Sequence, residues 1–498
     1  MGKQMTAALC AALVVGMATA NNLRISNLEV KGRDNSTALI KFDIAWENSW
    51  RFADAGDPLY FHDAAWVFFK VKPDGKADWE HARLAGAGVN PPGFETGEGT
   101  TVELAVPADG MGLFVRRAAD GVGTTAVQKV AAVWDFTANG LAKTDKVRIQ
   151  AAGLEVCYVA EGAFKVGDGQ GDMGQFEDGQ SGQPYAITNA SQEILLGGGA
   201  PGTLNSHQGT GMNTKDDFNY TAGKGALPPD FPTGYNAFYC MKYQVTQGQY
   251  ADFLNTLTRQ QQATRCSATT VGNYMSDANG AMKNRNTVRV MEDSDPYPRV
   301  YTNASPDRAC NWLSWADLTA FLAWSGLRPL TELEFEKACR GPLEPVAGEF
   351  AWGNTAIKEQ TGHSGADGGG SEEPVPADAN CCFNNKMGGP VRAGIYARAN
   401  STRERSGASY WGIMELSGNV WERTVSVGNA TGRNFTGTHG NGTLLANGEA
   451  SVALWPNATA TGAGYRGGNW RSAASSARAS DRSRAANVNA IRVSTYGG

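Results

Sequence analysis

Four short blocks in the second half of the chain constrain its fold more than any other feature. They combine glycine, asparagine, tryptophan and acidic residues: RPLTELEFEKACRG (328–341), GIMELSGNVWE (412–422), GYRGGNWRS (464–472) and AIRV (490–493). Long polar stretches with little periodicity surround them, at 167–232, 263–299, 354–389 and 425–462. Loops of this length count against one compact domain, unless the fold itself is rich in irregular structure.

In this order, the four blocks resemble the formylglycine-generating enzyme, or sulfatase-modifying factor, family. The resemblance covers about residues 153–493. It implies a variant of the C-type lectin fold, which has little regular secondary structure and is stabilised by ions and loop packing. We therefore expect an α+β chain with large irregular content, in which residues 151–498 form this domain.

The preceding residues, 22 to about 150, follow a different pattern, in which apolar and polar residues alternate with period two. The runs are LRISNLEV, ALIKFDIAW, AAWVFFKVK, TVELAVPA, LFVRRA, KVAAVWDF and KVRIQA, separated by turn-forming residues. Several short strands at this spacing are typical of an antiparallel sandwich. The sequence therefore predicts an N-terminal antiparallel β-sandwich over residues 21–150.

Helix starts are predicted at three positions in the second domain. Thr246, Ser314 and Thr331 are each followed, three residues later, by a side chain that can return a hydrogen bond to the cap. This reciprocal arrangement satisfies amide groups that are otherwise free in the first turn of a helix. The stretch around Thr246 reads as a strand that leads into a helix.

The N-terminus and the charge of the chain bear on its location and partners. Residues 1–20 contain Lys3, an apolar run and the small-residue pattern Ala18-Thr19-Ala20, which together predict a secretory signal peptide. No later stretch has the length of apolar sequence that spans a bilayer. The formal net charge of −5 gives no basic footprint for nucleic acid. We expect a secreted or cell-surface protein, with the periplasm as an alternative, that binds no nucleic acid.

Seven cysteines follow the predicted signal peptide. An odd number leaves at least one outside any intramolecular disulfide, and the spacing does not fix the pairing. None has the spacing of a metal finger. They are Cys157, Cys240, Cys266, Cys310, Cys339, Cys381 and Cys382.

The SGNVWE block suits a hard cation, because calcium takes six to eight oxygens and a glycine-containing turn directs carbonyls inward. By resemblance, the calcium ligands are the side chains of Glu415 and Glu422 and the carbonyls of Gly418 and Val420. A turn with two solvated glutamates is the alternative. By resemblance, a second calcium site of the family would include Asn380. The sequence around Asn380 departs from the family pattern.

Catalysis depends on cysteine in the oxidases of this family. By resemblance, two cysteines that follow the GG-aromatic motif by two and seven residues hold monovalent copper. The aromatic residue here is Trp470, and the two positions are Ser472 and Ala477. A hydroxyl is a poor ligand for copper(I), and a methyl group is none. We therefore expect no copper and no catalytic residue. Cys381 and Cys382 are far away in sequence, and neighbouring residues seldom direct two sulfurs at one ion.

Other enzyme classes find little support in the sequence. Another branch of the family uses non-haem iron held by a histidine cluster from an additional helical domain. The five histidines are scattered singly: His62, His81, His207, His363 and His439. The chain contains neither a nucleophile elbow nor a helical zinc motif. GDGQGD (167–172) lacks the lysine context of a phosphate-binding loop.

The segment 469–490 is dense in serine, alanine, arginine and asparagine. It resembles the variable region of proteins diversified by retroelements, and by resemblance it forms the surface that is the active cleft of the oxidases. Arginine and tryptophan are common anchors at contact surfaces. Arg466, Arg478, Arg482 and Arg492 have a structural alternative, in which they pair with acids inside a loop-rich core. The expected ligand-binding residues are Trp470, Arg471, Ser472, Ser476, Arg478 and Arg482.

These observations predict an exported, calcium-stabilised, non-catalytic protein for recognition or surface assembly. Its partner would be a protein or glycan at the cell surface, with self-assembly possible. Two alternatives stay open: a structural subunit of an extracellular filament, sheath or surface layer, and a metal-dependent oxidoreductase acting on protein cysteine.

Overall fold

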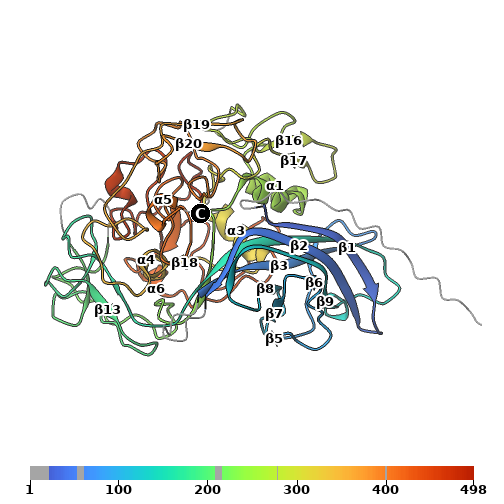
Figure 1. The fold of residues 1–498 in the computed structure, drawn as a ribbon, viewed down its shortest axis with the longest axis horizontal. Coiled ribbons are helices and arrows are strands. Elements are labelled where there is room, and N and C mark those ends of the chain that lie inside the picture. The colour runs from blue at the N-terminus through green and yellow to red at the C-terminus, as the bar shows by residue number, and fades with distance from the viewer. Residues whose placement is uncertain (1–21, 53–60, 208–215, 277–278, 399–400) are drawn as a thin grey trace, which may run out of the picture. The chain divides into compact units, whose positions relative to one another are not determined.

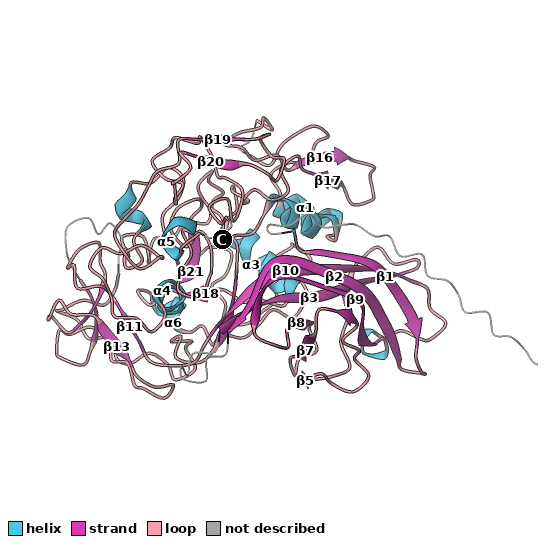
Figure 2. Cartoon of the chain, in the orientation of Figure 1, coloured by secondary structure: helices cyan, strands magenta, loops and turns pink. Residues whose placement is uncertain are grey.

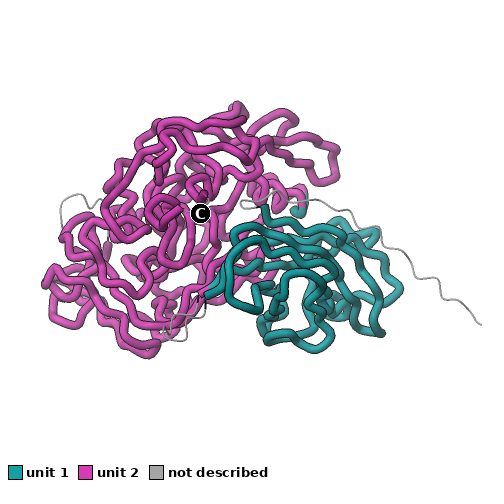
Figure 3. Tube along the Cα trace, in the orientation of Figure 1, with its two compact units in different colours: residues 1–53, 62–155, 256–258 teal, residues 54–61, 156–255, 259–498 magenta. Residues whose placement is uncertain are grey.

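The computed structural model of the chain describes residues 22–52, 61–207, 216–276, 279–398 and 401–498. The predicted signal peptide, residues 1–20, lies outside these ranges. The chain divides into two compact units (Figure 3), residues 1–53, 62–155 and 256–258 in the first and 54–61, 156–255 and 259–498 in the second.

The first unit consists of antiparallel strands around one apolar core (Figure 1). All seven predicted strand runs form strands, because alternating residues place one apolar row on the inner face. Strand β2 pairs with β1 on one side and β9 on the other. The result is a sandwich-like, half-barrel sheet, whose strands are β1 Arg24–Gly32, β2 Thr37–Phe52, β3 Phe61–Pro73, β4 Glu80–His81, β5 Gly88–Val89, β6 Glu98–Gly99, β7 Val102–Val106, β8 Leu113–Arg117, β9 Gly121–Asp135 and β10 Val147–Val159.

The core of this unit is made by the inward rows of the long strands. Ile40, Phe42, Ile44 and Trp46 alternate along β2 with less buried residues, and all four are at most 1% exposed. Nearly every residue of β3 is buried. This accounts for its continuous apolar sequence, since a strand covered on both faces has no solvent row.

The second unit contains short elements joined by long loops (Figure 2). Its strands form two- and three-stranded sheets, apart from β15, which pairs with the last four residues of β10, Val156–Val159, themselves part of this unit. They are β11 Phe164–Val166, β12 Phe176–Asp178, β13 Tyr185–Ile187, β14 Leu204–Ser206, β15 Phe238–Met241, β16 Arg289–Glu292, β17 Val300–Thr302, β18 Leu330–Thr331, β19 Gly362–Ser364, β20 Glu373–Val375, β21 Glu422–Val425 and β22 Ala463–Arg466.

All three predicted helix starts are confirmed. Ser314 and Thr331 each accept a hydrogen bond from the third helical amide, while the acid at that position bonds back to the cap. Thr246 and Gln249 exchange the same pair of bonds. The helices are α1 Gln247–Asn255, α2 Arg259–Arg265, α3 Trp315–Ser325, α4 Glu332–Arg340, α5 Arg403–Ser406 and α6 Ala430–Arg433, with short 3-10 turns at Thr137–Asn139 and Ala474–Ala477.

A small sheet positions the candidate site. Strand β21 pairs in parallel with β18 and antiparallel with β22. The SGNVWE block leads directly into β21, and the segment 469–490 follows β22. The two sequence features singled out above therefore extend from neighbouring strands. None of the helices in the described ranges has the length and apolar character that a membrane crossing requires.

Candidate functional site

The loop before β21 has an unusual backbone. Glu415 adopts a left-handed conformation with φ of 55°, which costs a non-glycine residue on the order of 1 kcal/mol or more. Gly418 has φ of 88°, and a Cβ there would lie 2.5 Å from the Cys381 sulfur. Such outliers persist only where their surroundings hold them, and they concentrate at functional sites.

Three oxygens of this loop converge on one side-chain amide. The Gln244 Nε2 atom lies 2.7 Å from Glu422 Oε1, 2.9 Å from the Val420 carbonyl and 3.3 Å from the Glu415 carbonyl. An NH₂ group has only two hydrogens to share among the three oxygens. Half-turn rotation of the amide would present the Gln244 oxygen instead, at the cost of the bond that this oxygen accepts from Asn419 Nδ2 at 3.0 Å.

Among the described residues, neither glutamate has a basic side chain within hydrogen-bonding distance. Glu415 Oε1 accepts a hydrogen bond from the Gly394 amide at 2.7 Å, whereas its Oε2 is buried without a partner among the described residues. Burial raises the pKa of Glu415 to about 8, and the nearby Glu422 contributes to this rise. Burial likewise raises the pKa of Glu422 to about 7. A divalent cation would supply the missing charge.

These residues fit calcium. Carboxylate, carbonyl and amide oxygens are the ligands of this ion, and Glu415, Val420, Glu422 and Gln244 would supply them. Gln244 was not among the predicted ligands. Its signal in the sequence was weak, because it lies about 170 residues before the loop and two of its three oxygen partners there are backbone carbonyls.

Asn380 is engaged elsewhere. Its Oδ1 accepts a hydrogen bond from the Lys358 amide at 2.8 Å, and its Nδ2 donates to the carbonyls of Glu404 and Ala356. None of the other predicted metal ligands is among these partners. The structure gives Asn380 a role in joining three loop segments.

The segment 469–490 is less exposed than the sequence suggested. Trp470 is 2% exposed, donates its indole N–H to the Ser494 carbonyl at 3.0 Å and packs in a core cluster with Cys382. Arg482 is 1% exposed. The prediction that these two side chains lie on a contact face is therefore wrong, since both are buried and make their contacts inside the unit.

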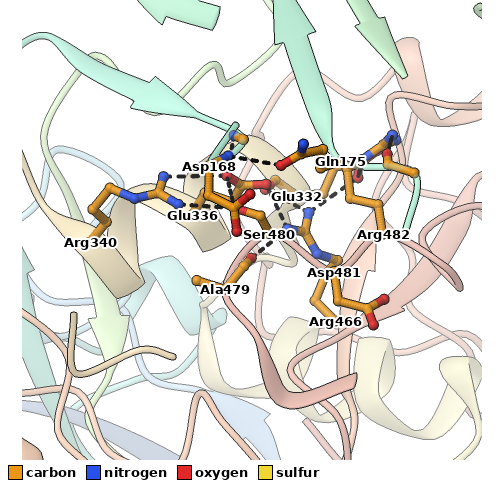
Figure 4. Close-up of polar contacts among 12 residues, drawn as sticks. Asp168, Gln175, Glu332, Glu336, Arg340, Arg466, Ala479, Ser480, Asp481 and Arg482 are labelled. Atoms are coloured by element: carbon orange, nitrogen blue, oxygen red, sulfur yellow. Dashed lines mark hydrogen bonds and ion pairs between the residues drawn. The ribbon is translucent and has the colours of Figure 1, made fainter. Parts of the chain in front are cut away.

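Arg482 belongs to a buried ionic network with Arg466 (Figure 4). Arg482 Nε lies 2.7 Å from Glu332 Oε2, and its Nη2 lies 2.8 Å from Asp216 Oδ2. Arg466 lies 3.3 Å from Glu332 and 2.7 Å from Glu336. The structural alternative holds for both arginines.

Two acids of this network, Glu332 and Glu336, come from one face of α4. Glu332, Glu336 and Arg340 are spaced by four residues, which places them one above the other on a helix. Arg340 pairs with Glu349 and, at 3.4 Å, with Glu336. The network joins α4 to the C-terminal segment.

Two further arginines near this segment also have carboxylate partners. Arg478 lies 3.3 Å from Asp172, and both side chains are partly exposed. Arg492 lies 2.7 Å from Asp317, the acid of α3 whose side chain bonds back to the cap residue Ser314.

Several of the less buried residues of the segment line a pocket of about 400 Å³. Arg471, Ser472 and Ser476 were predicted as contact residues and do line it. Arg478 and the buried Trp470 and Arg482 do not. The other residues in its wall were missed: Trp421, Asn469, Ala473, Arg484, Val493, Ser494, Thr495 and Tyr496.

The two positions of the family's cysteines fall in different surroundings. Ser472 lines the pocket, whereas the Ala477 methyl is buried with Phe350, Phe383 and Cys381. Cys381 is therefore close to this region, despite its distance in sequence. Its thiol donates to the Ser417 carbonyl at 3.2 Å, and burial raises its pKa well above the usual value.

Cys382 packs in a different cluster from its neighbour. Its side chain lies with Trp470 and Val420, and burial raises the pKa of its thiol to about 12. Two neutral thiols that enter separate clusters do not form a ready pair of thiolate ligands.

Comparison with known proteins identifies the second unit. Residues 187–494 match the family described as "Sulfatase-modifying factor enzyme 1-like domain". The chain belongs to this family. The sulfatase-modifying factor domain thus contains the loop before β21, the buried ionic network and the pocket.

One curated relative is hercynine oxygenase of Mycolicibacterium smegmatis (strain ATCC 700084 / mc(2)155), which is 32% identical over 123 residues. The match covers 24% of this chain and 22% of the relative, so the chain spans about a fifth of that relative's length. Within the described residues, no three or more histidine, cysteine, aspartate or glutamate side chains are grouped so as to hold a metal ion.

Proposed function

We propose that this chain is an exported, calcium-stabilised recognition or surface-assembly protein on a sulfatase-modifying factor scaffold. The domain would be a C-type lectin-like variant, with the exposed residues of 469–490 as its contact face for a protein or glycan. It would have no copper-dependent oxidase activity. The alternation of buried residues with small polar ones suits a segment diversified by a retroelement.

One observation carries the proposal. A pocket lies beside the GG-aromatic motif, but the two positions that bear copper-binding sulfurs in the family, by resemblance, hold a serine hydroxyl and a buried methyl group. Neither atom is a useful ligand for copper(I). The scaffold is thus kept without the metal ligands on which that oxidation depends, and binding is the function that the remaining pocket supports.

A thiol-oxidation assay tests this directly. The purified protein is incubated with a cysteine-containing sulfatase peptide, copper and oxygen, and formylglycine is measured by mass spectrometry. We expect product at the level of a buffer control, while a copper-dependent family oxidase converts the same peptide. Turnover above buffer would overturn the proposal.

The match to hercynine oxygenase favours a second candidate, a metal-dependent oxidoreductase. That candidate requires a redox metal bound by residues other than Ser472 and Ala477. Metal analysis of the purified protein distinguishes the two candidates.

A further inference from the structure

The arginines of the last 35 residues fall into two groups. Four of them, Arg466, Arg478, Arg482 and Arg492, pair with carboxylates at 2.7 to 3.3 Å. The other two, Arg471 and Arg484, line the pocket, and their guanidinium groups make no hydrogen bond or ion pair within the described residues. The two arginines without an internal partner are thus the two that face the same cavity.

The pocket carries no compensating negative charge. Its described lining residues include two arginines and neither aspartate nor glutamate. Hydroxyl groups of Ser472, Ser476 and Thr495 add further hydrogen-bonding capacity. A cavity with cationic walls and no acid concentrates anions, because its field is not cancelled locally.

The backbone of both arginines is held in place. The Arg471 backbone amide donates to Asn469 Oδ1 at 2.8 Å, and the side-chain Nδ2 of Asn469 donates to Ser472 Oγ at 2.6 Å. The Arg484 carbonyl accepts from the Tyr465 and Asn487 amides, both at 3.1 Å. The guanidinium groups therefore project from fixed points, which lowers the entropy lost when a ligand orders them.

A third arginine lies behind the pocket wall. Arg423 is 3% exposed, and its guanidinium carbon lies 5.4 Å from the ring centre of Tyr496, a lining residue. Its Nε and Nη1 have no hydrogen-bond partner among the described residues. This buried cation adds to the positive electrostatic potential on the side of the pocket formed by Tyr496.

We infer that the pocket binds an oxyanion group of the recognised ligand, a carboxylate, sulfate or phosphate, between Arg471 and Arg484. The planar guanidinium fork matches each of these groups with two parallel hydrogen bonds. The pocket volume of about 400 Å³ is larger than an oxyanion group. It also accommodates the part of the ligand to which that group is attached. The inference rests on the proposed function, whose ligand class it specifies.

The test uses inorganic sulfate, inorganic phosphate and acetate as probes, at constant ionic strength maintained with chloride. Binding is followed by thermal shift and calorimetry on the full chain and on Arg471→Gln, Arg484→Gln and the double variant. The control is Arg405→Gln, an exposed arginine of the same unit that does not line the pocket. General stabilisation by sulfate acts on all variants alike, so the comparison isolates the pocket.

We expect saturable binding by the wild type and by Arg405→Gln. Each pocket substitution should weaken it by about 10- to 100-fold, the loss of one charge-assisted contact. Arg471→Lys and Arg484→Lys keep the charge and should retain part of the affinity, even if a glutamine variant does not fold. The relative affinities of acetate and of the two tetrahedral anions show which oxyanion the pocket prefers.

Equal affinity in Arg405→Gln and in the pocket variants would overturn the inference, as would the absence of saturable binding by the wild type. Either result leaves the recognition proposal standing if the chain also fails to oxidise the cysteine peptide. Turnover of that peptide would overturn the recognition proposal whatever the anion result.

Discussion

Replacement of Arg482 by methionine should destabilise the second unit by about 3 to 5 kcal/mol, the usual cost of removing one partner from a buried ion pair. The substitution leaves Glu332 and Asp216 without the guanidinium that lies 2.7 and 2.8 Å from them. It also removes hydrogen bonds to the Gly174 carbonyl and to Ser206. Because methionine has a similar length, the decrease in unfolding free energy reflects the lost charge and hydrogen bonds more than a lost volume.

The matched control is Arg471→Met, in the same segment and with the same change of side chain. Because Arg471 is exposed, its substitution should change the unfolding free energy by no more than about 0.5 kcal/mol. Denaturant unfolding, followed by tryptophan fluorescence, compares the two. Similar destabilisation of both variants would contradict the division of this segment into buried and exposed arginines.

Calcium should raise the thermal midpoint of the metal-depleted protein by about 5 to 10 °C. A ligand at 100 times its dissociation constant stabilises by about 2.7 kcal/mol, and each kcal/mol moves the midpoint of a domain this large by about 2 to 4 °C. The physical reason is the pair of buried carboxyls, Glu415 and Glu422, whose pKa values burial raises and whose ionised forms a bound cation would stabilise. Differential scanning calorimetry with added calcium measures the shift.

This calcium effect should grow as pH rises from 6 to 8. In the metal-free protein the pKa values of Glu422 and Glu415 are raised to about 7 and 8, so at pH 6 both carboxyls are largely protonated. Calcium must then displace protons, which weakens its binding, whereas at pH 8 the Glu422 carboxyl is mostly ionised and that of Glu415 about half ionised. Glu415→Gln should abolish most of the shift, while Glu404→Gln, an exposed control, should not. An equal shift in both variants would exclude Glu415 as a ligand.

The local features of the fold were predictable from the sequence. The strands of the first unit follow from period-two alternation, which places an apolar row such as that of β2 on one face. The helix starts at Ser314 and Thr331 follow from side chains three residues apart. In both cases the structure depends on residues close together in the sequence, so the pattern can be recognised in one sequence alone.

The roles of the arginines depend on distant residues. Arg482 pairs with acids 150 and 266 positions away, and composition alone does not separate it from the solvent-facing Arg471. One signal was available, since Glu332, Glu336 and Arg340 recur every four residues along α4. Acids on a helix that is buried along its whole length require cationic partners, and here another segment supplies most of them.

The pocket was predictable only in part. Ser472 and Ser476 were found because they flank the GG-aromatic motif, whereas Trp421 and Tyr496 come from strand and tail segments that pairing brings together. The proximity of Cys381 to Ala477 likewise arises from loop packing across about 96 residues of intervening sequence. Such contacts follow from the fold and leave no periodic pattern in the chain.

Inductively coupled plasma mass spectrometry of the purified protein tests the central claim most directly, that the scaffold has kept a calcium-type site and lost the copper-binding one. The protein is isolated without chelators and exchanged into metal-free buffer. We expect at least about one calcium ion per chain, in keeping with the oxygen ligands at Glu415 and Glu422, and copper and iron far below one per chain. Copper or iron at one per chain, with no calcium, would contradict the account.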